Sequence, residues 1–252
     1  MTGKRYAALD GIRGIALFNM LLYHAVWDLV HLFGFDWLWY QSQPAYIWQQ
    51  SICWTFIFLS GFCQPLGRSW QSKLKRGGLV FLAGLFISAA TALAAPESLV
   101  LFGILTLIGS CMMLFVPLEF AFKKCPPTIG LTVSFAAFLL TKNINQGYLG
   151  LDCWNLAALP ERWYHNWATA YLGLPAPEFH STDYFPLLPW ACLFAAGYFL
   201  YQIFAEKELL HHLESSRMRP VEWLGRHSLI IYMIHQPVLY LLLSLLLLPI
   251  QG

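Results

Sequence analysis

The stretch Leu9–Gly34, LDGIRGIALFNMLLYHAVWDLVHLFG, sets the class of this protein. It is mostly apolar and long enough for a helix that crosses a bilayer, which needs about 20 such residues. It nevertheless carries five ionisable side chains, namely Asp10, Arg13, His24, Asp28 and His31. At about 100° per residue, these five side chains fall on a helix face roughly 60° wide. The stretch therefore predicts a transmembrane helix with one polar stripe.

The composition of the whole chain supports a membrane protein. Of its 252 residues, 58% are hydrophobic and only 11% are charged, whereas soluble domains have roughly 45–50% and about 25%. Mean hydropathy is +0.55. These values exclude a disordered tail, a nucleic-acid-binding module and an ordinary cytosolic enzyme. We expect an all-α, polytopic integral membrane protein in which residues 1–252 form a single domain.

Seven apolar segments are candidates for membrane-spanning helices: Gly11–Phe33, Ile47–Leu66, Gly78–Ala94, Leu99–Phe120, Thr128–Leu140, Tyr184–Phe204 and Ser228–Leu248. With the N-terminus in the cytoplasm, 13 of the 15 Lys and Arg residues fall on the inner side. Such an excess of positive charge is typical of cytoplasmic loops. We therefore predict seven spans, an external C-terminus and a long external loop over residues 143–183. The first segment lacks a small-residue cleavage site, so we expect a retained helix rather than a signal peptide.

His24 is the first candidate for a reactive residue. It lies 11 residues after Arg13, or roughly 16 Å along a helix, near the middle of a hydrocarbon core about 30 Å thick. An ionisable side chain at that depth costs about 2.5–3.5 kcal/mol and is expected to face a cavity. Asp28 is one turn away, where a carboxylate can orient an imidazole. We predict that His24 acts as general base or acyl acceptor, with Asp28 as its partner; the alternative is a polar pair that joins helices.

Other polar residues extend this candidate site. His235 lies 9 residues after Arg226, or roughly 13–14 Å along its helix, so it reaches a depth similar to that of His24. We expect His31, His235, Asp183 and Trp190 to contact an acceptor, although His235 could equally be a packing residue. For Asp183 and Trp190 the alternative is a helix cap with a kink, because two prolines interrupt the sequence DYFPLLPW. Asp10 and Arg13 are expected to form an ion pair or to bind substrate.

Aromatic residues and cysteines add two further expectations. The loop 143–183 is rich in Trp and Tyr, which fits either an aromatic belt with a short interfacial helix or stacking on a sugar. The six cysteines show no C-x-x-C motif and no metal-ligand spacing, so we expect buried thiols and no metal site.

Several motifs resemble a known family. Arg5-x-x-x-Leu9-Asp10-x-x-Arg13-Gly14-x-Ala16, followed by Met20 and His24, resembles the start of transmembrane acyltransferases. Further supporting motifs are FLSGF at 58–62, LFGILTLIG at 101–109, DYFPLLPW at 183–190 and LGRHSLIIYMIHQPVL at 224–239. Together they resemble the bacterial branch of the heparan-alpha-glucosaminide N-acetyltransferase family. The first and last motifs are also similar to the acyltransferase 3 family, whose members usually have more helices.

The resemblance implies a function. It implies transfer of an acetyl group from cytosolic acetyl-CoA to a sugar or glycan at the external face, with a membrane-embedded histidine that maps to His24. Whether the imidazole deprotonates the acceptor or takes the acyl group itself stays open. Five basic residues are candidates to hold the CoA phosphates, unless they only set the topology: Arg13, Arg68, Lys73, Lys75 and Arg76. By analogy we expect a bacterial inner-membrane protein and a homodimer.

Two functions of other classes remain. The polar stripe could be the proton relay of a transporter or flippase, although the chain shows no internal repeat of the kind many transporters have. It could also belong to a non-catalytic partner subunit. Stabilisation by acetyl-CoA and by free CoA would separate the enzyme from both alternatives.

Overall fold

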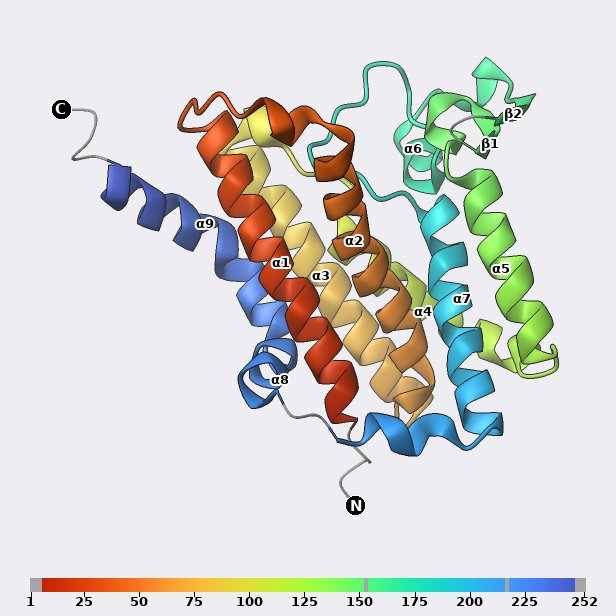
Figure 1. Cartoon of the computed structure of the whole chain (residues 1–252). Coiled ribbons are helices and arrows are strands. Elements are labelled where there is room, and N and C mark those ends of the chain that lie inside the picture. Colours follow the sequence, from red (N-terminus) through yellow and green to blue (C-terminus); the bar gives the residue numbers. More distant parts are fainter. Residues whose placement is uncertain (1–5, 152–153, 216–217, 248–252) are drawn as a thin grey trace. The chain divides into compact units, whose positions relative to one another are not determined.

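The computed structural model describes residues 6–151, 154–215 and 218–247, and its secondary structure is mostly helical. The chain forms two compact units. Residues 1–56 and 209–252 make up the first, which we call the terminal unit, and residues 57–208 make up the second, the central unit. Figure 1 labels the helices and strands of both units.

The terminal unit is built around α1. Its elements are α1 (Ala7–His31), the 3-10 helix η1 (Leu38–Gln41), the first part of α2 (Gln43–Cys63), the 3-10 helix η6 (Leu209–Leu213), α8 (Arg219–Arg226) and α9 (Ser228–Leu247). Helix α1 packs against both α8 and α9 (Figure 1). Where α1 meets α8, a Cβ atom on Gly14 would lie 1.9 Å from the Val221 carbonyl oxygen. Glycine is therefore needed for this close approach of the two backbones.

The central unit consists of two main helix pairs. Its helices are α3 (Trp70–Ala94), α4 (Ile104–Phe122), α5 (Pro127–Thr141), α6 (Trp167–Leu172) and α7 (Leu187–Glu206). Helix α3 packs on α4, and α5 packs on α7 (Figure 1). The 3-10 helices are η2 (Gln64–Leu66), η3 (Pro96–Ser98), η4 (Ile144–Gln146) and η5 (Glu161–Trp163). Buried aromatic rings fill its core; the centroids of the Phe115 and Phe194 rings, for example, lie 4.7 Å apart.

The helices follow the predicted apolar segments, with shifted ends. Helix α3 begins at Trp70 instead of Gly78, because the Ser69 side chain caps it by accepting a hydrogen bond from the Ser72 N–H. Helix α4 begins at Ile104 instead of Leu99. The mostly helical fold is confirmed, and one loop adds a hairpin that the sequence analysis did not predict. Within the loop 143–183, β1 (Tyr148–Leu151) and β2 (Trp154–Ala158) pair as an antiparallel hairpin.

Two glycines with positive φ angles shape β1 and its entry. Gly147 has φ 91° and Gly150 has φ 138°, conformations that cost glycine little and other residues much more. Gly150 also coincides with a shift in the strand register, as expected for a bulge. The same loop contains the short helix α6, which begins at Trp167 after Asn166 as its N-cap. A position of this helix at a membrane interface stays a prediction.

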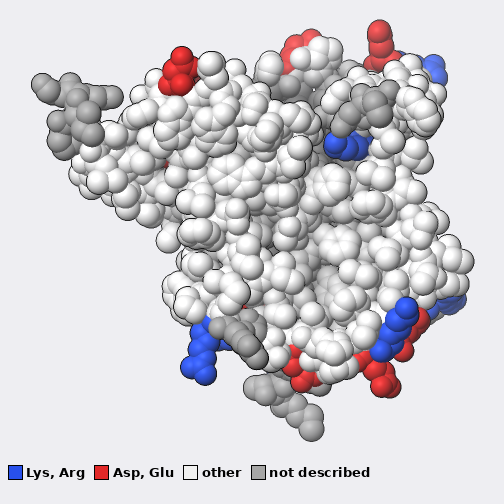
Figure 2. Space-filling model, in the orientation of Figure 1, with Lys and Arg blue, Asp and Glu red and all other residues white. Residues whose placement is uncertain are grey.

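Four helices of the described residues are long and apolar enough to cross a membrane, namely α3, α4, α7 and α9. Helix α5 has 15 residues, or about 22 Å of helix, and so is shorter than a hydrocarbon core of about 30 Å. On the face drawn in Figure 2, charged side chains lie near the helix ends and the surfaces between those ends are uncharged. These features are those of an integral membrane protein. The count of seven spans and the orientation of the termini stay predictions.

Candidate functional site

Two polar contacts join α1 to α9 inside the terminal unit. The rings of His24 and His235 are in edge contact, with centroids 4.6 Å apart and an interplanar angle of 67°. One helical turn further along α1, the Asp28 carboxylate accepts a hydrogen bond from Gln236 Nε2. Residues four apart on a helix share a face, so both contacts lie on the same side of α1. We call these four residues the His–Asp site.

The hydrogen bond of His235 determines its tautomer. His235 Nδ1 lies 2.5 Å from the carbonyl oxygen of Tyr232, one turn earlier on α9. A carbonyl oxygen only accepts, so Nδ1 must carry the hydrogen. In the neutral ring, Nε2 is therefore unprotonated and has a lone pair available for a proton.

Several buried polar atoms of the terminal unit have no hydrogen-bond partner among the described residues: Asp28 Oδ2, Tyr40 Oη, His235 Nε2 and Gln236 Oε1. Asp28 is fully buried, and His235 is 8% exposed. Each such atom costs about 1–3 kcal/mol relative to a bonded one. Three of the four belong to the His–Asp site, which is the pattern expected of a site built to receive a polar group.

The structure brings together His24, Asp28 and His235, but differently from the sequence prediction. Asp28 was expected to orient the His24 imidazole. Within the described ranges, no hydrogen bond joins the two, and the carboxylate is bonded to Gln236 instead. The sequence analysis did not single out Gln236. Its only signal was that it is a polar residue next to His235 in the apolar α9.

His31 and Tyr40 lie at the C-terminal end of α1. His31 is exposed, and its ring centroid lies 5.9 Å from that of the buried Tyr40 and 4.9 Å from that of Trp27. Tyr40 in turn contacts Tyr23, with ring centroids 5.3 Å apart. Aromatic rings therefore line this end of the helix, beyond Asp28.

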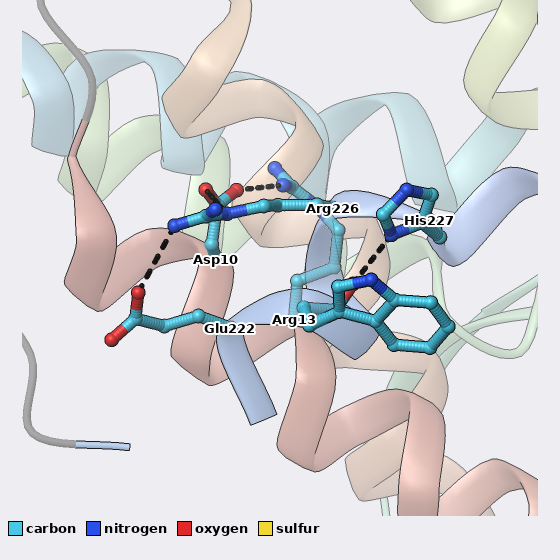
Figure 3. Close-up of polar contacts among 6 residues, drawn as sticks. Asp10, Arg13, Glu222, Arg226 and His227 are labelled. Carbon is cyan, nitrogen blue, oxygen red and sulfur yellow. Dashed lines mark hydrogen bonds and ion pairs between the residues drawn. The ribbon is translucent and has the colours of Figure 1, made fainter. Parts of the chain in front are cut away.

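An ion-pair cluster occupies the opposite end of α1 (Figure 3). Asp10 Oδ1 lies 3.1 Å from Arg13 Nη1, and Asp10 Oδ2 lies 3.7 Å from Arg226 Nε. Arg226 Nη2 lies 3.2 Å from Glu222 Oε2. Two guanidinium groups and two carboxylates therefore balance one another and join α1 to α8. Nearby, the Nδ1 of the exposed His227 lies 2.9 Å from the Trp223 carbonyl oxygen.

The basic residues expected to hold CoA phosphates differ in environment. Lys73 Nζ in α3 lies 2.6 and 2.7 Å from the two carboxylate oxygens of Glu119 in α4, and both side chains are buried. Arg13 belongs to the ion-pair cluster described above. Arg68, Lys75 and Arg76 are exposed. The charge of Lys73 is therefore paired inside the central unit, whereas the exposed residues Arg68, Lys75 and Arg76 present their charge to solvent.

Asp183 and Trp190 of the central unit make contacts within the protein, but Asp183 bonds to the start of α4 and not to α7, the helix that the cap alternative concerned. Asp183 Oδ2 accepts a hydrogen bond of 3.2 Å from the Ile104 N–H at the start of α4. Burial raises the pKa of the Asp183 carboxyl to about 6, and this hydrogen bond only partly opposes the shift. The Trp190 ring packs against Phe138 and Phe185, with centroids 5.4 and 5.0 Å away.

In the loop 143–183 of the central unit, two tyrosines are hydrogen-bonded to the protein, whereas two tryptophans are exposed. The Tyr164 hydroxyl donates to the Ile144 carbonyl oxygen at 2.6 Å, and the Tyr171 hydroxyl donates to Ser110 Oγ. Trp154 and Trp167 are instead largely exposed. The tyrosines thus anchor the loop, while these tryptophans are available to a membrane interface or to a ligand.

No cluster of three or more His, Cys, Asp or Glu side chains that could hold a metal ion occurs within residues 6–151, 154–215 and 218–247. Five cysteines of these ranges are not part of a disulfide: Cys53, Cys63, Cys111, Cys125 and Cys192.

Comparison with known proteins gives one match. The family described as heparan-alpha-glucosaminide N-acetyltransferase, catalytic, matches residues 5–237. No curated protein and no solved structure matches the chain. The matched range covers most of the sequence and includes all four residues of the His–Asp site. The chain therefore belongs to the catalytic family of heparan-alpha-glucosaminide N-acetyltransferase, a family of membrane acetyltransferases that use acetyl-CoA as donor.

Proposed function

We propose that this protein transfers an acetyl group from cytosolic acetyl-CoA to the amine or hydroxyl group of a sugar or glycan at the external face of the membrane. The family match supports the reaction class. The proposed arrangement has seven spans, with the N-terminus in the cytoplasm and the C-terminus outside. It places the ion-pair cluster of α1 at the inner side and the aromatic end of α1 at the outer side.

One observation carries the proposal: two imidazole rings in contact, His24 and His235, between the helices of a membrane protein. Ionisable residues within membrane-spanning segments are rare and mark functional sites by default. An imidazole can take the proton of an attacking amine or hydroxyl, or it can accept the acyl group before passing it on. Both routes require an imidazole that the thioester and the acceptor can reach.

The donor is proposed to bind from the cytoplasmic side. Arg68, Lys75 and Arg76 are exposed and basic, and charge-assisted hydrogen bonds to phosphate oxygens are among the strongest that proteins form. We assign the CoA phosphates to these three residues, because Arg13 and Lys73 already have carboxylate partners.

The test uses the purified full chain in lipid nanodiscs, with radiolabelled acetyl-CoA as donor and glucosamine as acceptor. The wild-type protein should form acetylated glucosamine. His24→Ala should lower the rate by about 1,000-fold or more, within the range that general-base and nucleophilic catalysis provide. Acetyl-CoA and free CoA should still raise its unfolding temperature by mass action. His227→Ala, an exposed histidine outside the site, is the matched control and should retain the wild-type rate.

The alternatives give different results. A transporter, a flippase or a non-catalytic subunit would form no acetylated product and would not be stabilised by CoA. Wild-type turnover in His24→Ala would remove His24 from the mechanism. Replacing Arg68, Lys75 and Arg76 together with Gln should weaken CoA stabilisation, and an unchanged CoA titration would leave these residues as topology signals only.

A further inference from the structure

The unpaired atoms of the His–Asp site share one chemical property. Asp28 Oδ2, His235 Nε2 and Gln236 Oε1 are buried and have no hydrogen-bond partner within the described residues. The Tyr232 carbonyl oxygen accepts a hydrogen bond from His235 Nδ1, so the ring hydrogen is on Nδ1. The Asp28 carboxylate accepts a hydrogen bond from the amide nitrogen of Gln236. The three atoms that remain are therefore all hydrogen-bond acceptors when Asp28 is ionised.

Acceptors of this kind can be satisfied only by a group that donates. The reacting end of acetyl-CoA, a carbonyl oxygen and a thioether-like sulfur, offers no hydrogen. An amine or a hydroxyl does, and an amine offers two or more. The site is therefore complementary to the amine or hydroxyl substrate and not to the thioester. Burial strengthens this preference, because each buried oxygen or nitrogen atom left without a hydrogen bond costs about 1–3 kcal/mol.

We propose that His235, and not His24, is the general base of the transfer, and that Asp28 and Gln236 hold the N–H or O–H group of the acceptor against His235 Nε2. This assignment rests on the proposed function. It gives the two histidines different tasks. His235 has its tautomer fixed with Nε2 as the basic atom, whereas no hydrogen bond fixes the His24 tautomer within the described residues. His24, whose ring contacts that of His235, is left with the thioester side of the reaction, so its loss is expected to slow transfer as well.

In the proposed transfer, one proton moves from the acceptor to His235 and then to the sulfur of CoA. The nitrogen or oxygen of the acceptor attacks the thioester carbon, and its proton passes to His235 Nε2. The new C–N or C–O bond forms, and the C–S bond breaks. The imidazolium then returns the proton to the departing sulfur, so the products are the acetylated acceptor and CoA thiol. The same nitrogen acts as base and then as acid.

Among the described residues, the ionisable groups that face His235 come from α1 and from its own helix. From α1 it faces His24 directly, and it faces Asp28 through the neighbouring Gln236. On its own helix it contacts the Tyr232 ring, with centroids 5.3 Å apart. The charged residues Glu222 and Arg226 of α8 are paired within the ion-pair cluster.

The decisive experiment is chemical rescue. His235→Ala and His235→Gln in nanodiscs, assayed with acetyl-CoA and glucosamine, should transfer at least about 100-fold more slowly than wild type, the lower end of what a general base contributes. Free CoA should still raise the unfolding temperature of both variants, which shows that they fold. Added imidazole should restore His235→Ala by tenfold or more. Across substituted imidazoles, the rescued rate should rise with the pKa of the added base, a dependence that a merely structural role would not produce.

The control arm is the same imidazole series with His24→Ala. Rescue of His24→Ala in place of His235→Ala would overturn the assignment, as would a wild-type rate in His235→Gln. Loss of transfer without rescue, in a His235 variant that still binds CoA, would overturn it as well. If the proposed function itself is wrong, the result is different, because the wild-type protein would then transfer no acetyl group.

Discussion

The two units of the molecule treat their buried polar groups in opposite ways. In the central unit, Lys73 is paired with Glu119, and Gln64 Nε2 donates to the Met112 carbonyl oxygen at 2.9 Å. In the terminal unit, Asp28 and its neighbours on α9 keep acceptor atoms without partners in the described part of the chain. Among the described residues of the central unit, one buried polar atom also has no hydrogen-bond partner, the hydroxyl oxygen of the fully buried Tyr198.

This difference distinguishes buried polar groups that stabilise the fold from those that serve function. A buried polar network whose members are all bonded rigidifies a fold. Buried acceptors without partners lower stability, and proteins keep such costs where they serve function. The same chemical signal in the sequence, a charged residue within an apolar helix, therefore has two meanings. Three sets of substitutions test whether the two units differ in this way.

The largest expected effect on stability is at the buried ion pair of the central unit. Lys73→Met leaves the Glu119 carboxylate buried without its partner, which should lower the free energy of unfolding by about 3–5 kcal/mol. Replacing both residues at once, Lys73→Met with Glu119→Leu, removes both charges and should come close to wild-type stability. Unfolding temperatures in one detergent measure both variants.

The double variant is the control for this prediction. Recovery of the unfolding temperature would show that the loss in Lys73→Met comes from the unpaired charge. If Lys73→Met unfolds at the wild-type temperature, then the pair contributes nothing, and Lys73 regains its place among the candidate phosphate ligands.

The opposite result is expected in the terminal unit. Asp28→Asn removes a buried charge but keeps an oxygen to accept from Gln236, so the unfolding temperature should rise by a few degrees, or about 1 kcal/mol. Acetyl transfer should fall by about 100-fold, because the acceptor loses the carboxylate that holds it. Thermal unfolding and the glucosamine assay on one preparation measure both effects. A lower unfolding temperature with unchanged transfer would make Asp28 a structural residue like Lys73.

Sequence reasoning could locate the site because helix geometry is regular. Counting residues from Arg13 and Arg226 gave similar depths for His24 and His235, and the structure brings their rings into contact. The polar stripe followed from the helical period alone. The hydrogen-bond partner of Asp28 could not be predicted from the helical period. Whether Gln236 faces α1 depends on the rotation of α9 about its own axis, and that rotation is determined by tertiary packing.

Pairings between distant segments were beyond local patterns as well. Lys73 and Glu119 are 46 residues apart, and each is an ordinary residue near the end of an apolar segment. Their pairing depends on α3 packing on α4, which the sequence did not indicate. The paired strands β1 and β2 were missed because they are short, four and five residues long, and show no clear alternation of apolar and polar residues.

Two adjacent glycines of α3 give the smallest and best-matched test of how tightly the central unit is packed. A Cβ atom on Gly77 would lie 2.9 Å from Met113 Cγ and 3.0 Å from Met112 Cβ, whereas a Cβ atom on Gly78 would meet nothing within 4 Å. Gly77→Ala should therefore lower the free energy of unfolding by about 1–3 kcal/mol through overpacking. Gly78→Ala should raise it by about 0.5–1 kcal/mol, because alanine favours the helix. Thermal unfolding of the two variants in one detergent should shift in opposite directions. Equal shifts would mean that α3 and α4 are less closely packed than this geometry requires, and would weaken the view that the central unit is the more rigid of the two, with most of its buried polar groups bonded.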